Sequence, residues 1–208
     1  MINFKIINKI IGALLFIEAT LMSLCLVMAI YFGEDDIFPF TISVVVTIFG
    51  GIVFRYFGYG AENILTRRDS FLVVTSVWII FSAFGTIPFL LGGYLHSFTD
   101  AFFENMSGFT TTGATIIDDV EALPHGILFW RSLTHWIGGL GIVFFTVALL
   151  PSLVGGSTKV FAAEATGPIK TRLHPKLSMG ARWIWMVYFV ITFGCMAGYM
   201  IFGMNWFE

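Results

Sequence analysis

Residues 109–115 read Phe-Thr-Thr-Thr-Gly-Ala-Thr, a composition suited to binding a dehydrated cation through the backbone. Threonine loses side-chain freedom in a helix and glycine loses backbone entropy, so the run predicts extended backbone. Inside a bilayer such backbone is tolerated only where its carbonyl groups line an aqueous cavity or bind something. Gly113 can adopt a positive φ angle, which would let successive carbonyl groups point toward one ion.

A short helix is predicted directly before the threonine run. Ser97 and Asp100 have the spacing of an N-terminal cap, and apolar residues then recur at helical spacing as far as Phe109. About 11 helical residues span only about 16 Å, so this helix could enter a membrane but could not cross it. Its negative C-terminal end would point at the run, and acidic residues beyond the run would attract cations at the outer mouth. These acidic residues are Asp118, Asp119 and Glu121. The alternative interpretation is an ordinary extracellular loop with a short surface helix.

Several residues of the next apolar stretch have types that could be functional. Arg131 and His135 lie one turn apart near its outer end, where Arg131 could pair with Asp118 or Glu104. We expect this pairing to be structural. Three small residues follow, and we expect them to allow close helix packing rather than to form a hinge; they are Gly138, Gly139 and Gly141.

Composition shows which elements must position these residues. The chain has 208 residues, of which 57% are hydrophobic and only 12% charged, and its mean hydropathy is +0.88. So much apolar surface, with a net charge of −2 and two cysteines, excludes a soluble globule, a disordered chain, a disulfide scaffold and a nucleic-acid binder. Stretches of about 20 apolar residues predict membrane-spanning helices. Five are expected, at 10–32, 38–54, 71–95, 128–150 and 179–202, with Pro88 kinking the third.

The distribution of basic residues predicts the orientation of these spans. With a cytoplasmic N-terminus, all of the 11 basic residues except Arg131 fall on the cytoplasmic side. The acidic residues of 34–36 and 118–121 then fall outside. Anionic lipid headgroups are a sufficient reason for the basic character of the connection 152–178.

Two motifs together point to a known family. They are residues 101–115, Ala-Phe-Phe-Glu-Asn-Met-Ser-Gly-Phe-Thr-Thr-Thr-Gly-Ala-Thr, and 129–142, Phe-Trp-Arg-Ser-Leu-Thr-His-Trp-Ile-Gly-Gly-Leu-Gly-Ile. They resemble the first pore repeat of the TrkH family, the membrane subunits of bacterial Trk potassium uptake systems within the Trk/Ktr/HKT superfamily. The resemblance covers essentially the whole chain.

The resemblance implies an all-α membrane protein with five transmembrane helices, one re-entrant pore helix and an extended filter loop. Two extra N-terminal helices would occupy 1–69. The first pore repeat, with outer helix, pore helix, filter and inner helix, would occupy 70–151. A basic cytoplasmic loop, 152–178, would lead to the outer helix of an incomplete second repeat, 179–208. One filter strand is a quarter of a ring, so we expect the chain to be part of a longer product.

The resemblance also implies a function. Backbone carbonyl groups of Thr111, Thr112, Gly113 and Ala114 would bind potassium, and glycine rather than serine at position 113 goes with potassium permeation in plant relatives. Potassium would be the transported ion, with no covalent cofactor and no enzymatic activity. The implied partners are membrane lipid, further pore repeats, a second copy in a homodimer, and a cytosolic nucleotide-binding regulatory subunit, with no nucleic acid. The implied location is the bacterial inner membrane.

Two other functional hypotheses differ in class. The chain could be a non-conducting fragment with a role in assembly. It could also be a membrane enzyme that uses His135 with Asp118 or Asp119 for hydrolysis or proton transfer, although no nucleophile-elbow or zinc-protease motif accompanies these residues.

Overall fold

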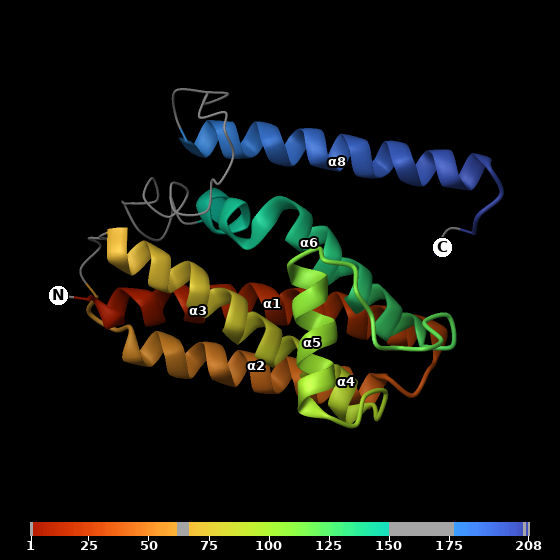
Figure 1. Ribbon diagram of the computed structural model, residues 1–208, viewed down its shortest axis with the longest axis horizontal. Helices are drawn as coiled ribbons and strands as arrows, with labels where there is room; N and C mark the ends of the chain where they lie inside the picture. The colour runs from red at the N-terminus through yellow and green to blue at the C-terminus, as the bar shows by residue number, and fades with distance from the viewer. Residues whose placement is uncertain (1, 62–66, 150–176, 206, 208) are drawn as a thin grey trace.

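The computed structural model describes residues 2–61, 67–149, 177–205 and 207, and their regular structure is all helical. The helices are α1 (Phe4–Phe32), α2 (Ile37–Phe57), α3 (Arg67–Gly85), α4 (Ile87–Leu91), α5 (Phe98–Phe109), α6 (His125–Leu149) and α8 (Leu177–Ile201). The long helices α1, α2 and α3 run side by side, and the short α5 crosses them at a steep angle (Figure 1). The chain therefore folds as long helices around one short transverse helix.

Four helical segments in the described ranges are long and apolar enough to cross a membrane: Phe4–Phe32, Ile37–Phe57, Phe71–Leu91 and Trp183–Ile201. They overlap four of the five expected spans. The remaining expected span, 128–150, corresponds to α6, which is not among the four. The third span ends at Leu91 rather than at residue 95, because Gly92 and a left-handed Gly93 (φ 70°) end the helix there. A total of five spans stays a prediction.

The buried core lies mainly along α1. The side chain of Asn3 accepts a hydrogen bond from the N–H of Ile6 and caps this helix, which therefore begins at Phe4 rather than at residue 10. One face of α1 packs against α2, α3 and α6. In contrast, α2 and α8 expose many large apolar side chains, as helices facing lipid do.

The α3–α4 break connects the outer span to the short helix. Pro88 has no N–H to donate, so the helix ladder is interrupted between Gly85 and Ile87. The indole N–H of Trp130 donates to the carbonyl of Gly85 (3.1 Å), and the Asn105 amide donates to the carbonyl of Ser82 (3.1 Å). Side chains from α6 and α5 thus satisfy the carbonyl groups beside the break, which holds the three helices together.

Candidate functional site: a short helix and the segment that follows it

The short helix α5 forms where the sequence predicts it. Ser97 has an extended conformation, and its hydroxyl accepts a hydrogen bond from the N–H of Thr99 (3.2 Å), so it caps the helix. The helix ends at Phe109, which is fully buried and packs edge-on against Phe81 and Trp130. This packing fixes the point at which the threonine run begins.

After α5, Ser107 holds the threonine run on both sides of Gly113. Its carbonyl accepts from the N–H of Thr112 (2.9 Å), and its hydroxyl donates to the carbonyl of Ala114 (2.7 Å). Gly113 has φ 75°, the positive angle that the sequence suggested, and Thr111 also has a positive φ of 54°. A non-glycine residue in this region is strained, and such strain clusters at functional sites.

The four candidate ligand carbonyls differ in their surroundings. Those of Thr111, Thr112 and Gly113 accept no hydrogen bond within the described part of the chain, and all three residues are exposed. The carbonyl of Ala114 already accepts from Ser107, so only its second lone pair is available. Three consecutive open carbonyl groups therefore follow the C-terminal end of α5.

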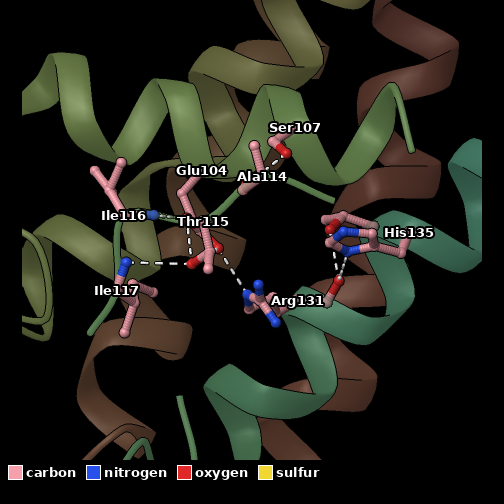
Figure 2. Close-up of polar contacts among 9 residues, drawn as sticks. Glu104, Ser107, Ala114, Thr115, Ile116, Ile117, Arg131 and His135 are labelled. Atoms are coloured by element: carbon pink, nitrogen blue, oxygen red, sulfur yellow. Dashed lines mark hydrogen bonds and ion pairs between the residues drawn. The ribbon is translucent and has the colours of Figure 1, made fainter. Parts of the chain in front are cut away.

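The carboxylate of Glu104 connects α5, α6 and the irregular segment 110–116, which we call the strand although it pairs in no sheet within the described residues (Figure 2). Its two oxygens lie 3.0 Å from the hydroxyl of Thr115, and one accepts from the N–H of Ile116 (3.1 Å). Nε of Arg131 donates to the other oxygen at 2.6 Å. The sequence left Asp118 and Glu104 as possible partners of Arg131, and the structure pairs Arg131 with Glu104. We call Glu104, Thr115, Ile116 and Arg131 the Glu104 network.

Asp119, one of the acidic residues after the threonine run, and His135 make separate hydrogen bonds. Asp118, Asp119 and Glu121 are exposed, and Asp119 accepts from the N–H of Ala122 (3.3 Å) within its own turn. Nδ1 of His135 lies 2.9 Å from the carbonyl oxygen of Arg131 one turn earlier. No hydrogen bond or ion pair joins His135 to either aspartate within the described ranges. The contacts therefore assemble no acid-base pair there.

The glycines of α6 have separate structural roles. A Cβ at Gly138 would overlap the carbonyl oxygen of Phe109, so this glycine lets α6 approach the end of α5 closely. Gly139 faces α8, where a Cβ would lie 2.6 Å from the hydroxyl of Tyr188. Gly141 interrupts the helix with φ 71° and ψ 135°, a conformation that favours glycine. Its role in helix packing stays a prediction.

Acidic residues before α2 bind the start of α6, which the sequence did not reveal. Glu34 accepts from the N–H of His125 (2.6 Å) and pairs with its ring (2.7 Å), while Asp36 accepts from the N–H of Ile127 (3.2 Å). Carboxylates complement the unpaired N–H groups and positive dipole at a helix N-terminus. The two residues of each pair are 91 positions apart, so no local sequence pattern predicts these contacts.

The connection 33–36 between α1 and α2 also contains and surrounds groups with raised pKa values. Burial and the nearby Glu34 raise the pKa of Asp36 above its ordinary value, although hydrogen bonds from Ile127 and Gly126 partly oppose the shift. Burial, together with Asp36, Asp35 and Glu34, raises the pKa of Tyr94 to about 12. The Tyr94 hydroxyl is therefore neutral at physiological pH.

Fold and site together define the class: an all-helical membrane protein in which a short transverse helix leads into an irregular segment with open carbonyl groups. The TrkH family model, described as a cation transport protein, matches residues 37–205. The chain therefore belongs to the TrkH family.

Individual relatives agree with this assignment. The chain is 35% identical to the Trk system potassium uptake protein TrkH of Halomonas elongata over 99% of its own length and 43% of that protein. It is also 35% identical to TrkG of Escherichia coli K12, over 98% of its own length and 42% of that protein. The crystal structure of the potassium transporter TrkH from Vibrio parahaemolyticus matches with a TM-score of 0.80 at 30% identity, covering all of this chain and 41% of that one. The chain thus spans less than half the length of these relatives.

Proposed function

We propose that this chain supplies one wall of a potassium pathway in a TrkH-like uptake protein. The observation that carries the proposal is the row of open, exposed carbonyl groups at Thr111, Thr112 and Gly113. In a selectivity filter, backbone carbonyl oxygens replace the hydration shell of a potassium ion. Ala114 is a weaker candidate ligand, because Ser107 occupies one lone pair of its carbonyl oxygen. The potassium named in the relatives' descriptions is consistent with this chemistry.

In this proposal α5 is a re-entrant pore helix and the strand after it is one quarter of a selectivity filter. Residues 1–69 supply two extra helices, 70–151 the first pore repeat, 152–178 a cytoplasmic loop and 179–208 the outer helix of the next repeat. The protein would lie in the bacterial inner membrane with a cytoplasmic N-terminus. Further repeats, a second copy and a nucleotide-binding regulator are its proposed partners. Residues 150–176, which include most of this loop, lie outside the described residues.

The outer-mouth acids fit the same proposal. Asp118, Asp119 and Glu121 are exposed and follow the strand directly, so they would raise the local concentration of cations. Because the attraction is long-range, it would weaken as ionic strength rises. Their role is therefore electrostatic and requires no direct contact with the ion.

Substitution of Gly113 tests the proposal. In the assembled transporter, Gly113→Ser should lower potassium over sodium selectivity, and Gly113→Arg should abolish uptake, because a side chain enters the strand beside the open carbonyl groups. Gly113→Ala is the matched control, since it adds the backbone strain of a positive φ, about 1–2 kcal/mol, without a polar group.

Rubidium uptake in potassium-starved cells, with and without competing sodium, measures both effects. Membrane content of each variant is quantified in parallel. If Gly113→Ser and Gly113→Arg reach the membrane and keep normal uptake and selectivity, the filter assignment is wrong.

A further inference from the structure

The Glu104 network, defined above as Glu104, Arg131, Thr115 and Ile116, has a geometry that simple packing does not require. Glu104 is only 1% exposed, yet it is a carboxylate with donors from two other segments. A buried carboxylate is costly unless it is paired and hydrogen-bonded. Here both of its oxygens are satisfied, and the donors come from the strand after α5 and from α6 (Figure 2).

The donors from the strand lie directly beyond the candidate ligands. Ser107 fixes the carbonyl of Ala114, and Glu104 binds the next two residues, Thr115 and Ile116. The open carbonyl groups at 111–113 are thus followed by three consecutive residues held by α5. Their position depends on these attachments, because the strand has no ladder partner within the described ranges.

Arg131 extends the attachment to α6. Its Nε lies 2.6 Å from Glu104, a charge-assisted bond of the strong type, and its side chain is 20% exposed. A shift of α6 along its axis would move the charge that holds Glu104, and Glu104 would in turn move Thr115 and Ile116. The network therefore connects the position of α6 to the outer end of the strand.

We infer that Glu104 and Arg131 are positioning residues that set the cation selectivity of the filter by holding its outer end at Thr115 and Ile116. This inference rests on the proposed function, since it concerns the same strand. Neither residue touches the ion. Their effect acts through the placement of the carbonyl groups of 111–113.

Thr115 gives the cleanest test, because it is exposed and its replacement leaves the buried ion pair intact. Thr115→Val removes the hydroxyl that bonds both oxygens of Glu104, whereas Thr115→Ser retains it. In the full-length transporter, Thr115→Val should lower the potassium over sodium ratio of uptake by about three- to tenfold, the effect of losing one ordinary hydrogen bond. Thr115→Ser should restore the ratio to within about twofold of the parent.

Variants of the acid itself extend the test. Glu104→Gln keeps the size and an acceptor for Ile116 but leaves Arg131 without its opposite charge, and it should shift the ratio in the same direction. Glu34→Gln is the matched control, because it removes another carboxylate that binds α6, the one at His125, away from the strand. It should change the amount of protein at most, and not the selectivity.

The outcomes separate two failures. If Gly113→Ser changes selectivity while Thr115→Val and Glu104→Gln leave it unchanged, the positioning role is overturned and the filter assignment stands. If none of the three changes selectivity at normal membrane content, the proposed function itself is wrong. A selectivity change in Glu34→Gln equal to that in Thr115→Val would also overturn the inference, because the effect would not be specific to the network.

Discussion

Asp36 shows how one residue of a connecting loop can fix a distant helix. It is fully buried, and one of its oxygens accepts from the N–H of Ile127 near the start of α6. Its other oxygen has no hydrogen-bond partner among the described residues. Burial and the neighbouring Glu34 raise its pKa, so the folded state binds the proton more tightly than the unfolded chain does. The interaction with α6 is thus retained against an electrostatic cost.

The sign of this shift gives a pH prediction. Because the folded-state pKa of Asp36 lies above the unfolded value, 3.8, its contribution to folding stability falls as pH rises from about that value through the raised pKa. Asp36→Asn removes the titrating group while its amide oxygen can still accept from Ile127. Relative to this variant, the parent protein should therefore become less stable as pH rises above about 4.

Thermal midpoints in detergent at several pH values measure the difference. Asp35→Asn is the control, because Asp35 is adjacent in sequence but exposed. Equal pH dependence for the parent protein and Asp36→Asn would contradict the assignment.

Some residue-level features could be predicted from the sequence and others could not. The Ser97 cap and the positive φ of Gly113 depend on local chemistry, and both appear in the structure. The bonds from Glu104 to Thr115 and Ile116 depend on how the strand folds back along α5, which composition does not encode. Glu18 marks the same limit: it is buried in α1, and neither carboxylate oxygen has a hydrogen-bond partner among the described residues.

At the scale of elements, the contact between α5 and α6 is governed by small residues. A Cβ at Gly138 would overlap the carbonyl of Phe109, and a Cβ at Gly108 would overlap the hydroxyl of Thr134. Each glycine thus lets one helix approach the backbone or a buried side chain of the other. The end of α5, where the threonine run begins, is placed by this contact.

Two adjacent glycines make a matched test of that packing. Gly138→Ala places a methyl group against backbone that cannot move without displacing α5, so it should destabilise the fold by about 1–3 kcal/mol. Gly139→Ala meets only the hydroxyl end of the Tyr188 side chain, which can rotate away. Gly139→Ala should therefore destabilise the fold less than Gly138→Ala does.

Thermal midpoints of both variants in detergent, with rubidium uptake of the assembled transporter, measure the contrast. Uptake should fall in Gly138→Ala and persist in Gly139→Ala. The packing account fails if the two alanine variants are equally stable.

Helix ends could be predicted from the sequence where the composition changes sharply. They could not be predicted where the backbone torsion angles of glycine residues end a helix. Apolar stretches located four of the described helical spans, and Pro88 marked the break between α3 and α4. Gly92 and Gly93 ended the third span earlier than its apolar pattern suggested. Gly141 illustrates the limit, since nothing in its Gly-rich surroundings indicated that it would have a positive φ.

At the scale of the whole molecule, the exposure of the strand indicates what must surround it. Residues 110–116 are exposed, and they include the four residues 111–114 whose carbonyl groups are the candidate ion ligands. A dehydrated ion needs oxygens on all sides, and one strand supplies them on one side only. The large exposed apolar side chains of α8 leave surface for lipid or for further helices. The pathway that we propose therefore requires other repeats to close it.

Reconstitution tests this requirement directly. The purified 208-residue chain in liposomes should give no potassium-selective rubidium flux above that of empty vesicles, because three open carbonyl groups on one strand cannot enclose an ion. The transporter assembled with its further repeats should conduct, and its flux should fall with Gly113→Arg. The reconstituted chain should be strongly helical by circular dichroism. This control excludes unfolding as the reason for the absence of rubidium flux. Selective flux through the chain alone, lost in Gly113→Arg, would show instead that copies of this chain close the ring among themselves.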